Sequence, residues 1–273
     1  MTRPPHHRAG RENGTVLLRT DHSHYTSVEV AAPHLADRIG PGQFVSVPAP
    51  HGFGPPGRWM FSAAAVRHDA GDTSALRLVA RRGGNGLGAL DHLRAGDTLP
   101  LIGPLGTPLH LPGADDTTVV IGVDHGASAA LLTAEALHTD GRSTRLHLFA
   151  PEPVEETAAP WLEPPPRVAA RAEATPGPRE WPRRVAALTD GAGRAVIAAP
   201  TPLAHAAFQV CREREVPCWV LVEPFMACGI GVCLTCAVPL ATEDTYLRAC
   251  VDGPVFPADR LAWERILPAG RPA

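Results

Sequence analysis

Four cysteines in the last quarter of the chain have the spacing of a metal or redox centre. They form the pattern Cys-x4-Cys-x2-Cys-x13-Cys, made by Cys228, Cys233, Cys236 and Cys250. Thiolates bind zinc and the iron of iron–sulfur clusters, and this order of spacings is the plant-type [2Fe-2S] order. The pattern therefore predicts that these four cysteines ligate a [2Fe-2S] cluster.

The residues between the cysteines suit a small cluster. Gly229 and Gly231 allow a tight loop in which backbone N–H groups point at sulfur. Structural zinc usually uses two Cys-x2-Cys knuckles or Cys/His pairs, whereas the first spacing here is four, so zinc is the alternative for the four thiols. The other two cysteines, Cys211 and Cys218, fall on an expected helix and an expected strand and are interpreted as packing residues.

The composition of the chain limits the classes of function that such a metal or redox centre could have. The chain has 273 residues, 44% of them hydrophobic, which favours two or more domains. Its net charge of −3 leaves no basic field for nucleic acid. All 25 basic residues other than histidine are arginine, which excludes P-loop lysines and Schiff-base chemistry.

The sequence also favours a reducing compartment. No apolar run approaches the ~18 residues that would span a membrane, so no membrane partner is expected. Residues 1–14 are polar and lack the apolar core of a signal peptide, and they are expected to form a disordered tail. These features predict a cytoplasmic protein, in which cysteines serve metal or redox chemistry more often than disulfides.

Residues 15–113 consist of short β-prone runs separated by glycine and proline turns. Strands at this regular spacing predict a small antiparallel β-barrel. Five runs were identified: 15–20, 25–32, 43–50, 76–82 and 97–106.

Residues 114–222 change to an α/β pattern. Apolar strands without alternation favour a parallel sheet covered on both faces. Strands are expected at 118–122, 144–149, 194–199 and 216–222, and helices at 127–138 and 203–214. Residues 151–182 are rich in proline, glutamate and arginine and are interpreted as a loop-like insert.

The cysteines fall in an appended lobe, residues 223–257, followed by a C-terminal tail, 258–273, with a short helix. The fold class is therefore multidomain β plus α/β: an antiparallel barrel, an α/β nucleotide-binding-like domain and a C-terminal cluster lobe.

Two motifs in this lobe resemble a known family. MACGIGVCLTC, residues 226–236, and RACVDGPVF, residues 248–256, are similar to the cluster lobe of electron-transfer subunits of dihydroorotate dehydrogenase, which are ferredoxin-reductase-like flavoproteins. The resemblance covers nearly the whole chain. It implies FAD on the barrel, a nicotinamide site on the α/β domain, and a [2Fe-2S] centre facing a catalytic subunit that carries FMN.

The resemblance also implies flavin-binding residues. Gly84 and Gly86 match the glycine turn that approaches the FAD pyrophosphate, although Leu87 stands where the family has Thr or Ser. The sequence Arg58-Trp59-Met60-Phe61-Ser62 corresponds to the Arg-Pro-Ile/Leu-Ser motif, with Trp59 in place of the arginine. Arg58, Phe61 and Ser62 are therefore the remaining FAD candidates, and Arg58 would supply the charge from a shifted position.

The nicotinamide motif departs further from the family. Relatives have a Gly-Gly-Gly-Ile-Gly-like turn, whereas this chain has Gly122-Val123-Asp124-His125-Gly126, so only Gly122 and Gly126 remain as candidates for NAD. Asp124 places negative charge where phosphate would lie. The later Cys-Gly-Pro-x-Pro signature is reduced to residues 198–202 without its cysteine. An α/β domain kept as a scaffold is the alternative.

The resemblance implies an electron-transfer oxidoreductase subunit of pyrimidine biosynthesis. Electrons would pass from FMN of a dihydroorotate dehydrogenase-like partner, in a hetero-oligomer, through [2Fe-2S] and FAD to NAD. One alternative is a non-catalytic or regulatory [2Fe-2S] protein that has lost its nicotinamide site. Others are a different ferredoxin-reductase-like component and a zinc-stabilised interaction module.

Overall fold

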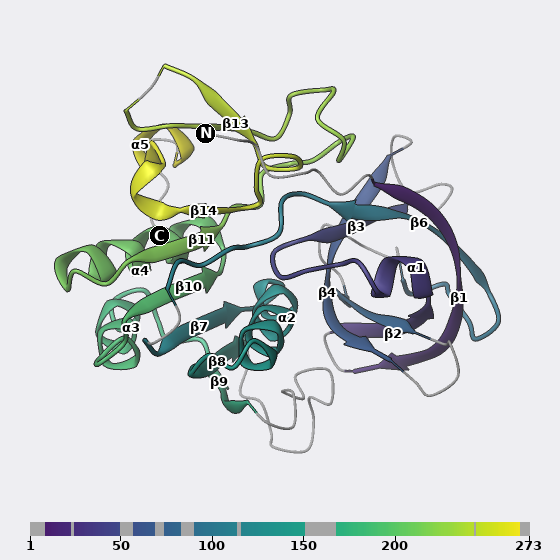
Figure 1. Cartoon of the computed structure of the whole chain (residues 1–273), viewed down its shortest axis with the longest axis horizontal. Helices are drawn as coiled ribbons and strands as arrows, with labels where there is room; N and C mark the ends of the chain where they lie inside the picture. Colours follow the sequence, from purple (N-terminus) through teal and green to yellow (C-terminus); the bar gives the residue numbers. More distant parts are fainter. Residues whose placement is uncertain are drawn as a thin grey trace.

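The computed structural model describes most of the chain, which forms three parts that follow one another in the sequence (Figure 1). The described residues are 9–22, 25–49, 57–68, 74–82, 90–113, 116–150, 168–242 and 244–267. The candidates Gly84 and Gly86, and the neighbouring Leu87, lie outside them. No helix of the described ranges is both long enough and apolar enough to cross a membrane.

The N-terminal part is a closed antiparallel barrel with the strand order β1-β2-β5-β4-β3-β6. Its strands are β1 (Gly10–Asp21), β2 (Tyr25–Ala31), β3 (Phe44–Pro48), β4 (Arg58–Arg67), β5 (Ala75–Arg81) and β6 (Thr98–Leu105), and one short helix, α1 (Pro33–Ala36), follows β2. Apolar side chains such as Val28, Leu76 and Leu101 fill the interior and are fully buried. The barrel expected from the spacing of β-prone runs is confirmed.

Two features of the barrel differ from the expectation. β1 begins at Gly10 and pairs with β6 from its first residue, so the tail predicted for 1–14 is wrong for residues 10–14. β4 was not expected as a strand because alanine, which occupies 63–65, has low β propensity. Pairing with β3 and β5 on either side determines its conformation instead.

The second part is a six-stranded sheet with the order β14-β11-β10-β7-β8-β9. Its parallel strands are β7 (Thr118–Val123), β8 (Thr144–Ala150), β9 (Ala169–Ala174), β10 (Arg194–Ala198) and β11 (Cys218–Leu221), and β14 (Val255–Pro257) is the antiparallel edge. Its helices are α2 (Gly126–Thr139), α3 (Trp181–Leu188) and α4 (Thr201–Glu213).

Alternate residues of the central strands pack against different helices. Val120 and Val196 face α2, whereas Ile121 and Ile197 face α3 and α4. Both faces of the sheet are covered, which explains why β7 is buried throughout. α2 lies between the sheet and the barrel, where it also contacts β4 (Figure 1).

The loop-like insert expected over 151–182 is wrong for its second half. β9 pairs in parallel with β8 along its whole length, and α3 begins at Trp181. The Trp181 ring is fully buried edge-on against Phe149, with ring centroids 5.3 Å apart, and its indole N–H donates to the Leu203 carbonyl at 3.0 Å. Tertiary packing of this ring therefore orders a segment that shows no periodicity.

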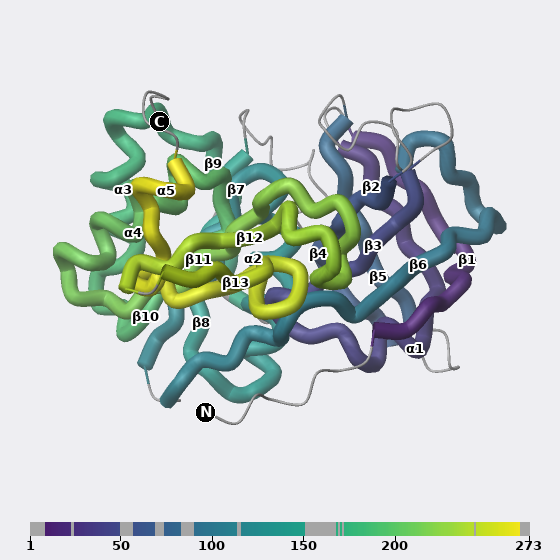
Figure 2. Tube along the Cα trace, turned by 90° about the horizontal axis from the view of Figure 1, so that it is seen from above, coloured from purple at the N-terminus to yellow at the C-terminus, as the bar shows by residue number. Residues whose placement is uncertain are grey.

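The third part lies across the other two (Figure 2). It contains β12 (Ala237–Pro239) and β13 (Tyr246–Arg248), which pair with each other, then β14, the 3-10 helix η2 (Ala258–Arg260) and α5 (Trp263–Ile266). Through β14 the lobe adds a strand to the large sheet beside β11. One apolar cluster includes Leu105 of the barrel, Ile197 of the sheet and Cys250 of the lobe.

The C-terminal tail predicted for 258–273 is wrong for residues 258–267, although its expected short helix is present as α5. Trp263 is 6% exposed, donates its indole N–H to the Ala258 carbonyl at 2.8 Å, and stacks on Phe208 of α4. Leu261 forms a β-bridge with Leu240. This segment therefore fastens the lobe to the α/β domain.

Candidate functional site

The four predicted ligand cysteines come together in two close pairs. The Sγ atoms of Cys228 and Cys233 are 3.3 Å apart, and those of Cys236 and Cys250 are 3.2 Å apart. Three of these residues lie in the loop between β11 and β12, and the fourth follows β13. Pairing of β12 with β13 is what returns Cys250 to the loop.

Two glycines with positive φ shape this loop. Gly229 has φ +71° and Gly231 has φ +80°, values that favour glycine. A Cβ on Gly229 would lie 2.7 Å from Cε of Met60 in β4, and one on Gly231 would lie 2.5 Å from Cγ2 of Val251. Because both positions lack a Cβ, the loop can lie close to β4 of the barrel at Gly229 and close to Val251 of the same lobe at Gly231.

Hydrogen bonds to sulfur differ between the two pairs. The Thr235 hydroxyl lies 3.1 Å from Cys233 Sγ, and hydrogen bonds from Thr235 and Cys228 lower the pKa of Cys233 to about 6. Burial, together with Cys236, raises the pKa of Cys250 to about 12. Without a bound cation, the exposed pair is therefore the one that more readily supplies the thiolate that a metal requires. Sequence reasoning missed Thr235, although it lies between two ligands in the motif.

The arrangement of the thiols distinguishes between a cluster and a single ion. Zinc needs four ligands around one point. Within the described ranges, no group of three or more His, Cys, Asp or Glu side chains is placed to hold a single metal ion. Two irons bound by four cysteines take two thiolates each, and two separate thiol pairs match that requirement. The residues therefore fit a [2Fe-2S] cluster better than zinc.

The remaining cysteines are in the apolar core. Cys211 on α4 and Cys218 on β11 are buried and belong to the cluster of side chains between sheet and helices. A hydrogen bond to Cys218 lowers the pKa of Cys211, whereas the same bond and burial raise the pKa of Cys218. Their position agrees with the packing interpretation.

The flavin candidates on β4 do not converge on one surface. Arg58 donates to the Ser46 carbonyl at 2.6 Å and the Pro100 carbonyl at 3.2 Å, so it fastens β4 to β3 and β6. Burial, with a smaller effect of Arg11, lowers its pKa. Phe61 is 8% exposed and packs into the barrel core, whereas Ser62 is half-buried. Because successive residues of a strand point to opposite faces, Arg58 and Ser62 share a face that Phe61 does not.

Trp59 packs against the barrel core, on the same face of β4 as Phe61. Its indole N–H is buried and has no hydrogen-bond partner among the residues that the structure describes. A buried, unsatisfied donor costs on the order of 1–3 kcal/mol, so an acceptor at this position would stabilise the protein. Trp59 stands where the related motif has arginine, and its ring packs against the barrel core instead of sharing the face of Arg58 and Ser62.

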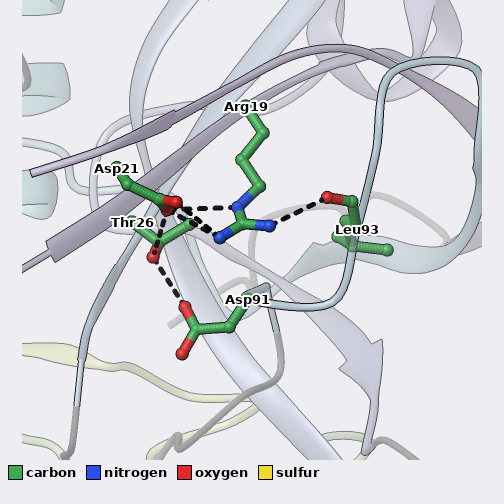
Figure 3. Close-up of polar contacts among 5 residues, drawn as sticks. All are labelled: Arg19, Asp21, Thr26, Asp91 and Leu93. Carbon is green, nitrogen blue, oxygen red and sulfur yellow. Dashed lines mark hydrogen bonds and ion pairs between the residues drawn. The ribbon is translucent and has the colours of Figure 1, made fainter.

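A polar network fixes the chain immediately after residues 83–89 (Figure 3). Arg19 of β1 forms a bidentate pair with Asp21, from Nε to Oδ1 at 3.1 Å and from Nη2 to Oδ2 at 2.6 Å, and donates to the Leu93 carbonyl at 3.4 Å. Thr26 of β2 donates to Asp91 at 2.6 Å. Hydrogen bonds from Arg19 lower the pKa of Asp21. The network holds residues 91–93 against the barrel.

Packing explains the two candidate nicotinamide glycines. A Cβ on Gly122 would lie 2.6 Å from Cβ of Ala130 in α2, and one on Gly126 would lie 2.1 Å from the Ala198 carbonyl oxygen. Both glycines therefore allow α2 to pack closely on β7 and β10. Their presence does not require a phosphate ligand.

The turn between these glycines carries a charged network. Asp124, with φ +54°, accepts from the Tyr25 hydroxyl at 2.6 Å and pairs with Arg81 at 3.1 Å. His125 Nε2 lies 2.5 Å from Oε2 of Glu223. The network joins β2 and β5 of the barrel to the turn after β7 and to the first residue of the lobe.

These contacts keep His125 charged. Burial acts to lower its pKa, but hydrogen bonds to Asp124 and Glu223 outweigh burial and raise the pKa to about 10. Burial likewise acts to raise the pKa of Asp124, and hydrogen bonds from His125 and Tyr25 lower it on balance. At neutral pH the network therefore contains an imidazolium between two carboxylates.

His125→Gln is expected to destabilise the protein in a pH-dependent way. Because the folded pKa lies above the ordinary value of 6.5, the contribution of His125 is complete below pH 6.5 and is lost as pH rises through about 10. The side chain is 49% exposed, which screens the charges, so we expect about 1 kcal/mol at pH 6. Urea unfolding at pH 6 and pH 10.5 measures this difference.

The control for that experiment is His68→Gln. His68 lies 3.5 Å from Asp37, and both side chains are more than half exposed. This variant should match the wild type at both pH values. An equal loss for His125→Gln at pH 6 and pH 10.5 would contradict the charged role of His125.

Comparison with known proteins agrees with the cluster geometry. Residues 223–262 match the family model of the iron-sulfur cluster binding domain of dihydroorotate dehydrogenase B. The chain is 26% identical over 258 residues to an electron transfer subunit of dihydroorotate dehydrogenase B (NAD(+)) from Desulforamulus reducens, covering 87% of this chain and 92% of the relative. The corresponding subunit from Bacillus cereus (strain Q1) is 27% identical over 232 residues, covering 80% and 85%.

Solved structures show the same fold. The NADH-dependent reduced ferredoxin-NADP oxidoreductase structure superposes with a TM-score of 0.75 at 20% identity, covering 94% of this chain and 92% of that chain. Phthalate dioxygenase reductase superposes with a TM-score of 0.60 at 15% identity, covering 93% and 96%. The chain therefore has a ferredoxin-reductase-like fold, its residues 223–262 match the iron-sulfur domain of dihydroorotate dehydrogenase B, and most of its length is similar to the electron transfer subunits of that enzyme.

Proposed function

We propose that this chain is the electron-transfer subunit of a dihydroorotate dehydrogenase-type enzyme in pyrimidine biosynthesis. It relays electrons between FMN of a catalytic partner and FAD on its own barrel through a [2Fe-2S] cluster. The observation that carries the proposal is the pairing of four thiols, Cys228 with Cys233 and Cys236 with Cys250, within the segment that matches the iron-sulfur domain. The similarity of most of the chain to electron transfer subunits supports it.

Each part of the chain has a role in this relay. The four cysteines hold the cluster, and Ser62, Gly84 and Gly86 hold FAD. The bound cluster supplies one-electron transfer, while the chain sets its position and exposure. Cys233 is exposed and Cys250 is buried, so one thiol pair faces solvent and the other faces the core. Met60 of β4 lies against the cluster loop at Gly229, next in sequence to the flavin motif residue Phe61.

The proposed parts are the flavin barrel over 10–113, the nucleotide-binding-like domain over 114–222, and the cluster lobe from 223 onward. A cytoplasmic location is proposed with them, because four ligand thiols must stay reduced until the cluster is inserted.

Cofactor analysis of the protein purified without oxygen tests the proposal. We expect about two irons and two sulfides per chain, one FAD, and absorbance of both groups between roughly 300 and 600 nm. Zinc in place of iron would refute the cluster. Iron without flavin would refute the relay and support the alternative of a non-catalytic [2Fe-2S] protein.

The loop that carries the exposed thiol pair also presents four exposed apolar side chains, which we call the apolar loop surface. Phe225 and Val232 are 76% and 75% exposed, and Leu234 and Ile230 are 60% and 53% exposed. Large apolar side chains that gather on a surface mark interaction sites. We propose that this surface docks the FMN-carrying subunit, because electrons must enter the cluster over a short distance. Met226, which also flanks the ligands, packs against the core instead.

Val232→Glu is expected to weaken binding to the catalytic subunit by about 10- to 100-fold, because it places a charge at the centre of an apolar interface. The matched control is Leu18→Glu on β1, where the side chain is 52% exposed on the barrel. Titration of the two purified subunits measures the dissociation constant, and iron content shows that the cluster is retained. Equal binding by both variants would place the interface elsewhere.

A further inference from the structure

The carboxyl edge of the α/β sheet is where a nucleotide would be expected. β11, β10 and β7 are parallel neighbours, so their carboxyl ends lie at the same edge of the sheet. Open α/β sheets bind their ligands in the crevice outside this edge. Here the turn after β7 carries Asp124 and His125, and Glu223 follows β11, with the end of β10 between them.

An ion-pair bridge spans that edge. His125 Nε2 contacts Glu223 Oε2 at 2.5 Å, which connects the turn after β7 to the segment after β11 across the end of β10. Asp124 extends the bridge to the barrel through Tyr25 and Arg81. The crevice is therefore crossed by contacts that join all three parts of the chain.

The same residues oppose a phosphate ligand. A pyrophosphate needs free N–H groups and positive charge at the N-terminus of α2. The Ala127 N–H donates to the Asp124 carbonyl at 3.0 Å, and the Asp124 N–H donates to the Phe149 carbonyl at 2.8 Å. The carboxylates of Asp124 and Glu223 pair with Arg81 and His125, the cations closest to this turn in the network.

Packing against the sheet and α2 uses the space at the two glycines. Gly126 packs directly against the Ala198 carbonyl at the end of β10, and Gly122 packs directly against α2. Val123, between them, is 2% exposed and belongs to the core. The residues of this turn thus do not fit a pyridine nucleotide, although relatives are named for NAD(+).

We propose that the His125–Glu223 bridge, with Asp124, closes the nucleotide crevice, and that this relay delivers its electrons to an acceptor other than a pyridine nucleotide bound at residues 122–126. The proposed relay between FMN, the cluster and FAD does not depend on this inference. The inference limits the chemical class of the terminal acceptor.

Equilibrium dialysis of the cofactor-loaded protein with ADP-ribose tests the closure. ADP-ribose contains the adenosine and pyrophosphate of NADH and lacks the redox-active ring, so binding is measured apart from activity. We expect no binding by the wild type up to about 1 mM, the concentration range of weak nonspecific association. Asp124→Gly/His125→Ile, which removes the bridge and gives the turn two residues of the family motif, should bind at least tenfold more tightly.

Two further variants make the test specific. Glu223→Gln removes one carboxylate without changing the turn, and it should also gain affinity, by a smaller factor. The control is Asp190→Gly, which removes a carboxylate from an ion pair with Arg214 in the segment leading into β10, at the opposite edge of the sheet. This control should behave as the wild type does.

Each outcome decides the inference. Micromolar binding of ADP-ribose by the wild type, or failure of both bridge variants to gain affinity, would overturn it. Iron and flavin contents measured on the same samples report separately on the proposed relay. Absence of the cluster or the flavin from these samples would count against the proposed relay. The dialysis result would still decide whether the crevice is closed.

Discussion

Cys233→Ser is expected to remove the cluster while the protein stays folded. Cys233 is exposed, so the substitution disturbs no packing, whereas its thiol pairs with Cys228 at 3.3 Å and accounts for half of one ligand pair. Serine is a poor ligand for iron because its hydroxyl stays protonated at neutral pH. We expect iron to fall from about two per chain to less than about a tenth of that value.

The matched control is Cys218→Ala. It removes a buried thiol from β11, which precedes the ligand loop in the sequence. It should lower the free energy of unfolding by about 1 kcal/mol and retain both irons. Iron analysis, acid-labile sulfide and visible absorbance, with circular dichroism for the fold, measure the two variants. Unchanged iron in Cys233→Ser would refute its assignment as a ligand.

The cluster loop could be predicted because its information is local. Ligand type, ligand spacing and the glycines needed for a tight turn all lie within a short stretch, and the structure brings these cysteines together. The α/β core was predictable for the same reason: the helix expected over 127–138 is α2, Gly126–Thr139. Strong apolar runs determine such elements through burial of both sheet faces.

Other features depend on partners far away in the chain. The alanine-rich β4 is a strand because β3 and β5 pair with it, and α3 is ordered by burial of Trp181. The sequence identifies Arg58 as a candidate charge for FAD, but only the structure shows that its guanidinium fastens neighbouring strands. Local pattern carries no information about such pairings.

The turn after β7 illustrates the limit most clearly. Its departure from the glycine-rich motif is visible in the sequence, and the negative charge of Asp124 already argues against phosphate. The position of Glu223 beside His125 follows only from the parallel order of β7, β10 and β11. The order of the strands therefore places the residues of this degenerate motif in a specific ion-pair bridge.

Gly126→Ala is expected to destabilise the protein strongly even though no ligand is involved. An added Cβ would lie 2.1 Å from the carbonyl oxygen and 2.5 Å from the carbonyl carbon of Ala198, both backbone atoms of β10. Relief requires α2 to move away from the sheet, where its buried residues pack against Val120, Leu148 and Val196. Overpacking of this kind costs about 3 kcal/mol in the free energy of unfolding, measured by urea denaturation.

Gly177→Ala is the control, because no heavy atom of the described residues lies within 4 Å of the added Cβ at this exposed position. Its free energy of unfolding should stay within about 0.5 kcal/mol of the wild type. If Gly126→Ala proved equally harmless, packing would not explain the glycine, and contact with a phosphate would again be the physical reason for a glycine at this turn. A large loss confined to Gly126→Ala would instead show that close packing of α2 on β10 is a sufficient physical reason for a glycine at this position.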